Sequence, residues 1–214
     1  MKKISFFLMV ILVTFAFAAC DKEDNEPGNY FSYEGKNYMI DSAFVIEWVI
    51  NSGMENEFTI NQFLFTSVSG PDTTQLLIAV YDTLSNVLSG NYTSLDQVET
   101  ETASRGILPY GFIFYSVISI NNGYPFFTGK GGSLDVSVTN GNYSIKFNDI
   151  SAGLYGDLLD DDVNGNSEYT ETGKIGGQFN GIVEKYTEVF SKKSTKINPL
   201  FEKLIQEKIS QMKK

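Results

Sequence analysis

The sequence predicts an all-β domain, and we expect an antiparallel β-sandwich, with an up-and-down barrel as the alternative. Three observations predict this fold. Short segments alternate apolar and polar residues, Gly, Asn and Pro separate these segments, and hardly any helical periodicity stands between residues 29 and 190. Strand signals that recur at such short intervals are typical of sandwiches and barrels.

The clearest strand pair is a hairpin over residues 133–148. Apolar residues alternate with polar ones on both sides of a turn: Leu134, Val136 and Val138 before it, and Tyr143, Ile145 and Phe147 after it. Asn140-Gly141 between them tolerates the positive φ angles of a two-residue type I′ turn. Closing that turn places Val136 opposite Ile145 on the apolar face and Asp135 opposite Lys146 on the polar face.

The other strands follow the same pattern. We expect them at residues 30–33, 37–40, 43–50, 57–67, 75–83, 111–120, 124–128 and 174–183. The alternation of residues 57–67 slips by one at Asn61-Gln62, which predicts a β-bulge. The polar stretch 94–105 is predicted to be a loop.

Composition excludes several kinds of chemistry. The 214 residues contain no His and one Cys. Nucleophilic sites that pair Ser or Cys with His, and imidazole metal sites, are therefore unavailable. A single Cys also rules out an intramolecular disulfide.

Charge is distributed unevenly along the chain. Residues 20–190 carry 7 Lys and Arg against 24 Asp and Glu, whereas residues 191–214 carry seven Lys and two Glu. An acidic body argues against nucleic acid as a partner.

The N-terminus predicts export. Residues 1–19 combine a basic start, an apolar run and a small Ala18-Ala19 pair, the pattern of a signal peptide, and the run is short for a membrane span. The small pair before Cys20 resembles the lipobox of bacterial lipoproteins, although Phe17 stands where Leu is usual. The resemblance implies that Cys20 is acylated and anchors the chain to a membrane; the alternative is an ordinary cleaved signal.

Residues 20–28 form an acidic tether that ends in Pro27-Gly28. An acidic run after the lipidated Cys is similar to the surface-export signal of Bacteroides-type lipoproteins. The resemblance implies an outer membrane lipoprotein at the cell surface, with the periplasmic face as the alternative.

The basic tail, residues 191–214, predicts an amphipathic helix that starts at Pro199 with Asn198 as its N-cap. Its apolar residues recur at helical spacing: Leu200, Phe201, Leu204, Ile205, Ile209 and Met212. We expect this helix to pack on the β-domain (residues 29–190) and close one end of it. The alternative is a basic segment lying on an anionic membrane surface.

Four short motifs together resemble a group of uncharacterised Bacteroides-type surface lipoproteins. They are Gly90-Asn91-Tyr92, the Gly-Gly-x-hydrophobic-x-Val run at 131–136, the acidic turn at 160–165 and the Gly-x-Phe-x-Gly run at 177–181. The resemblance implies an extracellular β-domain without an established activity.

An acidic stretch matches the calcium-loop pattern D-x-[DN]-x-[DN]-G-x₅-E. The predicted ligands are Asp160, Asp162, Asn164, Asn166 and Glu171, with Gly165 at the sharp turn. The alternative is an acidic turn between two strands, because Asp, Asn and Gly are ordinary turn residues. Ca²⁺ is the one cofactor that the sequence suggests.

Aromatic residues suggest a second kind of site. Tyr124, Phe126 and Phe127 follow a turn and predict an exposed patch on which a sugar ring would stack, whereas Trp48 and Tyr115 lie within strong strand patterns and are expected in the core.

The resulting functional hypothesis is a lipid-anchored exported binding module, not an enzyme, that binds a glycan or a partner protein. The second hypothesis is a structural or adhesive surface component. The third is a hydrolase that uses a pair of carboxylates, whose positions sequence spacing does not reveal.

Overall fold

The computed structural model describes residues 28–50, 57–83, 88–96, 99–101, 103–109, 115–121, 123, 125–155 and 168–190. Within these residues nearly all regular structure is β, so the predicted all-β character is confirmed. The elements are β1 (Tyr30–Tyr33), β2 (Lys36–Met39), β3 (Ser42–Ile50), β4 (Phe58–Ser69), β5 (Asp72–Asp82), β6 (Gly90–Thr93), the 3-10 helix η1 (Glu99–Glu101), β7 (Arg105–Ile107), β8 (Val117–Ile120), β9 (Phe126–Thr128), β10 (Ser133–Thr139), β11 (Asn142–Tyr155), β12 (Tyr169–Ile182) and β13 (Glu184–Phe190).

The described strands join into one 13-stranded sheet. Its hydrogen-bonded path runs β13-β3-β4-β5-β8-β9-β11-β12-β1-β2, while β10 pairs with β11 and β6, and β7 pairs with β5. β13 pairs with β3 in parallel, and the other strand pairs along the path are antiparallel.

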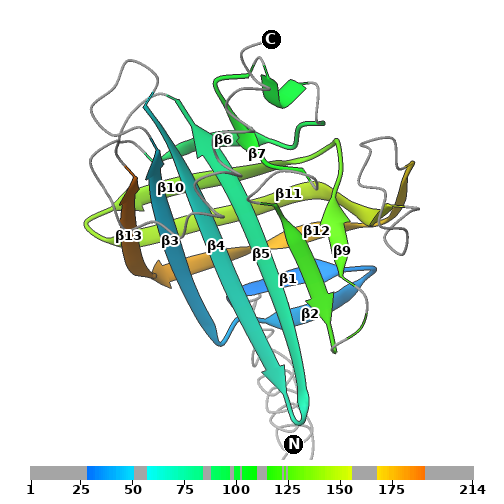
Figure 1. The fold of residues 1–214 in the computed structure, drawn as a ribbon. Coiled ribbons are helices and arrows are strands. Elements are labelled where there is room, and N and C mark those ends of the chain that lie inside the picture. The colour runs from blue at the N-terminus through cyan, green and yellow to red at the C-terminus, as the bar shows by residue number, and fades with distance from the viewer. Residues whose placement is uncertain are drawn as a thin grey trace, which may run out of the picture.

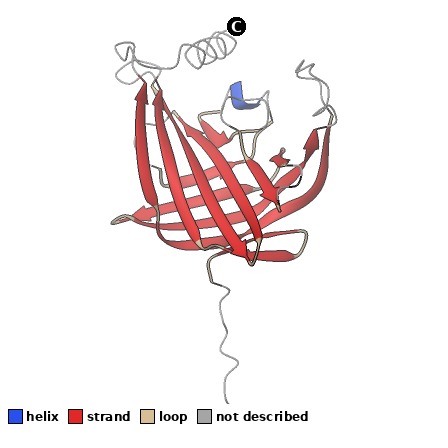
Figure 2. Ribbon diagram, turned by 60° about the horizontal axis from the view of Figure 1, so that its bottom comes forward, coloured by secondary structure: helices blue, strands red, loops and turns tan. Residues whose placement is uncertain are grey.

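This sheet curls so that two of its regions face each other. β3, β4 and β5 form one layer, and β11, β12 and β1 cross behind them in a second layer (Figures 1 and 2). Val183 alone separates β12 from β13, so the chain passes from one layer to the other within one residue. An open curled sheet is therefore established, and the choice between sandwich and barrel stays a prediction.

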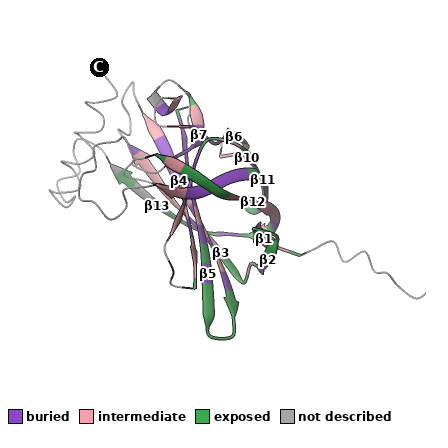
Figure 3. Ribbon diagram, turned by 90° about the vertical axis from the view of Figure 1, so that its right-hand side faces the viewer, coloured by how far each residue is buried: buried purple, intermediate pink, exposed green. Residues whose placement is uncertain are grey.

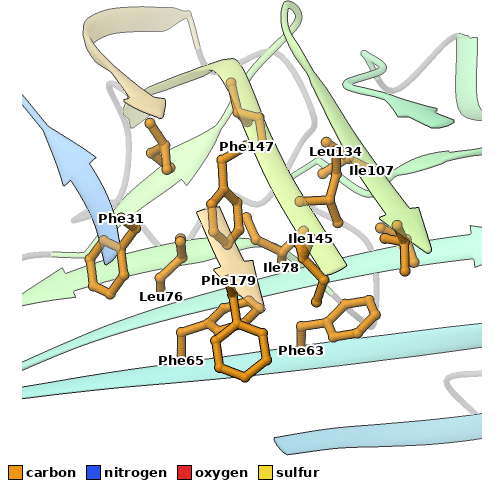
Figure 4. Packing of buried hydrophobic residues seen from close by; sticks show 14 of the residues in the cluster. Phe31, Phe63, Phe65, Leu76, Ile78, Ile107, Leu134, Ile145, Phe147 and Phe179 are labelled. Carbon is orange, nitrogen blue, oxygen red and sulfur yellow. The ribbon is translucent and has the colours of Figure 1, made fainter. Parts of the chain in front are cut away.

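The core fills the space between the two layers (Figure 4). Phe65 of β4 lies with its ring centroid 5.2 Å from that of Phe147 on β11 and 5.7 Å from that of Phe179 on β12. Phe63 contacts Tyr143 edge-on at 6.3 Å. Offset and edge-on aromatic pairs of this kind add about 0.5–1.5 kcal/mol each beyond the area they bury.

The predicted hairpin is confirmed in detail. β10 and β11 pair Val136 with Ile145 and Asp135 with Lys146. Asn140 and Gly141 take φ angles of 50° and 79°, as a type I′ turn requires. Lys146, which stands opposite Asp135, is not the main partner of the Asp135 carboxylate. Its oxygens accept hydrogen bonds from the side-chain amides of Asn91 and Asn148, which, with a minor contribution from Lys146, lower the pKa of Asp135.

We expect Val136→Asp to destabilise the protein by several kcal/mol, because Val136 is 5% exposed and the variant buries a charge in the core. Ser137→Asp is the matched control, since Ser137 is the exposed neighbour on the opposite face. Urea titrations followed by circular dichroism measure both. Equal losses in the two variants would contradict the assigned faces.

Two local predictions are wrong. No bulge forms at Asn61-Gln62, because β4 keeps continuous register with β3 and β5 there; Asn61 turns inward and is only 2% exposed. The bulges lie instead in the β11–β12 pairing, next to Asn148 and Ala152. The polar stretch 94–105 is also more ordered than a loop, since it holds η1 and the start of β7. The predicted strand ranges also lack β6, β7 and β13.

A buried ion pair joins β5, β6 and β7. The guanidinium of Arg105, the single Arg of the chain, contacts the Asp82 carboxylate and lies over the ring of Tyr92, 5.0 Å from its centroid. Asp82 is 3% exposed. Gly90 makes room for this arrangement, because a Cβ there would lie 1.8 Å from Arg105 Nη1.

Exposure is concentrated at the margins of the sheet. The β4–β5 hairpin extends beyond its neighbours, and its tip at residues 68–73 is exposed (Figure 3). Within the described residues no helix is long and apolar enough to cross a membrane. The predicted signal peptide, most of the tether and the predicted C-terminal helix fall in residues 1–27 and 191–214, outside the described residues.

Candidate functional site

Three of the residues predicted for function lie within the described part of the chain. Phe126 and Phe127 are on β9, and Glu171 is on β12. The others lie outside it: Cys20, Tyr124, Asp160, Asp162, Asn164 and Asn166.

Phe126 and Phe127 point to opposite faces of β9, as neighbours on a strand do. Phe126 packs against Tyr33 of β1, with ring centroids 5.1 Å apart, and joins the edge of the core. Phe127 faces the other way and is 4% exposed. The exposure expected of this patch is therefore not found at Phe127, because other aromatic rings cover it.

Those rings and Phe127 form an aromatic row, which we define as Tyr115, Phe127, Tyr155 and Tyr169. Successive centroids are 5.8 Å, 6.2 Å and 5.1 Å apart. Tyr115 is 43% exposed, and Tyr155 and Tyr169 are half-buried. The row thus has one buried ring, Phe127, beneath three tyrosines that reach the surface.

Sheet pairing explains why residues so far apart in sequence meet. β9 lies between β8 and β11, and β11 pairs with β12. Tyr155 stands directly opposite Tyr169, and Gly153 stands opposite Phe127. Paired residues on neighbouring antiparallel strands project to the same face, so Phe127, Tyr155 and Tyr169 lie on one face of β9, β11 and β12. Tyr115, two residues before β8, extends the row.

Gly129 is part of this construction. A Cβ at residue 129 would lie 2.3 Å from Cε1 and Cζ of Tyr169, so the tyrosine ring rests directly on the glycine backbone. Any larger side chain would displace Tyr169 from the row.

A polar chain lies beside the row. Ser151 Oγ is 2.8 Å from Glu171 Oε2 and 2.9 Å from the Tyr169 hydroxyl oxygen. Because Ser151 donates its one hydroxyl hydrogen to the carboxylate, the Tyr169 hydroxyl donates to Ser151. Burial, assisted by the charge of Glu171, raises the pKa of Tyr169 to about 12 despite the bond to Ser151, so this hydroxyl stays a donor at neutral pH.

Of the predicted calcium ligands, only Glu171 lies within the described residues. Its side chain is exposed, and one of its oxygens accepts the Ser151 hydrogen bond. Among the described residues, no group of three or more His, Cys, Asp or Glu side chains is placed to hold a metal ion. Calcium binding by the acidic loop stays a prediction.

Sequence reasoning missed most of the row. Tyr115 was expected in the core but is exposed, and Tyr155, Tyr169 and Ser151 were not considered. The sequence does contain a feature that predicts the contact between Tyr155 and Tyr169. These two tyrosines flank the acidic stretch, and residues at the ends of two connected antiparallel strands stand opposite each other.

Comparisons of the chain with protein-family models, with curated proteins and with solved structures find no match.

Proposed function

We propose that the protein is a lipid-anchored, exported binding module that holds a glycan on the aromatic row. The observation that carries this proposal is a row of three partly exposed tyrosines over a buried phenylalanine, with a carboxylate at its end. Anchoring through acylated Cys20 and display at the cell surface, with the periplasmic face as the alternative, come from the sequence resemblance.

The chemistry of the row suits a sugar. A pyranose ring presents a flat face of C–H groups that packs on aromatic rings, while its hydroxyls need hydrogen-bond partners at the edge. Tyr115 and Tyr155 supply rings, and the exposed Glu171 supplies an acceptor. Sites with apolar walls and a few oriented polar groups are the usual small-ligand sites of proteins.

Pre-organisation supports the proposal. Tyr169 is held by its Ser151 hydrogen bond and by its seat on Gly129, so it loses little conformational freedom when a ligand binds. The architecture that we propose for residues 29–190 is the predicted antiparallel sandwich, since the two layers face each other across one core. The row then lies outside that core.

A glycan array probed with the purified full chain tests the function. We expect retention of at least one glycan class, and we expect Tyr115→Ala to weaken it by about tenfold or more, because a stacking surface is removed. Isothermal titration with the retained glycan gives the affinity. Tyr186→Ala is the matched control, since Tyr186 is 57% exposed on β13 and should leave binding unchanged.

Binding that persists in Tyr115→Ala and in Glu171→Gln would place the glycan elsewhere. An array that retains no glycan would remove the proposal and favour the structural or adhesive hypothesis.

A further inference from the structure

The layer of β3, β4 and β5 is apolar on both of its faces. Val45, Phe63 and Ile78 point into the core and are fully buried. In the middle of these strands the outward positions carry no charged residue: Phe44, Ile46 and Trp48 on β3, Ile60, Gln62 and Leu64 on β4, and Leu77, Ala79 and Tyr81 on β5. A sheet that faces water on one side normally alternates apolar with polar residues, so this one is built to be covered on both sides.

Part of the outward face is covered by the chain between β6 and β8. Leu95 and Leu108 pack on Ile60, Ala79 and Tyr81 as a second buried cluster. The Tyr81 hydroxyl donates to the carbonyl oxygen of Ala103 and so holds this segment down.

Most of the rest of that face stays only half-buried, although Ile50 at the end of β3 is 2% exposed. We define the outer apolar face as Phe44, Ile46, Trp48, Leu64 and Leu77, all of intermediate exposure. Trp48 and Leu77 border the second buried cluster, and Phe44 also packs against the core at the sheet edge. At its margin on β13, Tyr186 is 57% exposed and meets Phe44 edge-on, with ring centroids 6.1 Å apart. Contiguous apolar surface of this kind marks an interaction site.

We propose that the chain's own C-terminal segment, residues 199–214, packs on the outer apolar face as an amphipathic helix. The place where the described chain stops supports this occupant. β13 lies beside β3 at the edge of the same layer, and its last residue, Phe190, pairs with Ile50 at the end of β3. The described chain therefore ends beside this layer, and residues 191–198 connect that end to the proposed helix.

Length also fits. A helix over residues 199–214 is roughly 24 Å long at 1.5 Å per residue, and the nine residues of β3 span roughly 30 Å. Its apolar residues recur along one side: Leu200, Phe201, Leu204, Ile205, Ile209 and Met212. Covering one sheet face with an amphipathic helix is a standard layer arrangement.

Charge favours the C-terminal segment, rather than a second copy of the chain, as the occupant of the outer apolar face. Residues 191–214 carry seven Lys against two Glu, and residues 20–190 carry 7 basic against 24 acidic residues. A basic segment is attracted to this acidic body, whereas two acidic bodies repel each other.

Disulfide cross-linking tests the proposal. In the full chain with Cys20→Ser, the introduced thiols are the only ones. Leu64→Cys with Ile205→Cys is expected to form an intrachain disulfide on mild oxidation, seen as a faster-migrating band in non-reducing gels. Leu64→Cys with Ser210→Cys is the control, since Ser210 falls on the polar side of the helix and should stay reduced.

A parallel pair, Ile46→Cys with Ile205→Cys, guards against a local failure at Leu64, and circular dichroism verifies that each variant folds. Absence of an intrachain link from both Ile205 pairs would overturn the proposal. Interchain dimers in place of the intrachain link would also overturn it and assign the face to a second copy. Equal linking of Ile205 and Ser210 would show contact without a specific helix face, which contradicts the packing proposed.

Discussion

Phe65→Ala is expected to lower the free energy of unfolding by about 3–5 kcal/mol, the usual cost of removing a buried phenylalanine ring. Phe65 is fully buried and lies where the two layers meet, against Phe63, Phe147 and Phe179 (Figure 4). Neither layer can move inward to fill the cavity without breaking strand pairing along β4. Denaturant titration of the purified protein measures the loss.

Val68→Ala serves as the control for Phe65→Ala. It lies on the same strand, but its side chain is 55% exposed at the hairpin tip, so we expect a change within about 0.5 kcal/mol. A loss at Phe65 no greater than that at Val68 would mean that the layers do not pack as described.

Arg105→Met is expected to cost about 3–5 kcal/mol, because it leaves a charged Asp82 buried without its cation. The Asp82 side chain is 5% exposed and that of Arg105 is 24% exposed. The Tyr92 hydroxyl contacts the same carboxylate oxygen at 3.4 Å, and burial beside this carboxylate raises the pKa of Tyr92. A double-mutant cycle in urea with Asp82→Leu measures the coupling, and the double variant should recover much of the loss.

The pair of Lys185 with Glu47 provides the comparison. Its N–O distance is 2.8 Å, but 40% of the Lys185 side chain is exposed, so we expect Lys185→Met to cost about 0–1 kcal/mol. Similar losses for Arg105→Met and Lys185→Met would show that burial does not distinguish the two ion pairs.

Residues close together in the sequence were sufficient to predict the hairpins. The Asn140-Gly141 turn determines the register of β10 and β11, because its two positive φ angles fix which residues face each other. The strands of the β1–β2 hairpin were also predicted, and Glu34 and Gly35 take positive φ angles at its turn. These features depend on neighbours in sequence, and a sequence displays such neighbours directly.

Strands defined by distant partners were harder to predict. In β13, Lys185 and Thr187 occupy positions where an apolar residue would be expected, because they bind Glu47 at an open edge of the sheet. Asn61 suggested a bulge because a polar residue stood at an inward position, yet the strand continues and buries it.

The candidate site shows the same limit. Phe126 and Phe127 could be singled out as aromatic, but which of them faces the core depends on pairing with β11. The contact of Tyr155 with Tyr169 requires β11 and β12 to meet across the acidic stretch, and that of Tyr115 with Phe127 requires β8 beside β9. No single segment carries the row.

The pairing of the first strand with the twelfth has a consequence for how the chain acquires its fold. Asn29 and Asn180, 151 residues apart, exchange two hydrogen bonds of 3.0 Å and 2.7 Å at the edge of the β1–β12 ladder. A chain that emerges N-terminus first must therefore wait for nearly the whole domain before β1 finds its partner. High contact order of this kind slows folding and leaves strand edges open to aggregation during the delay.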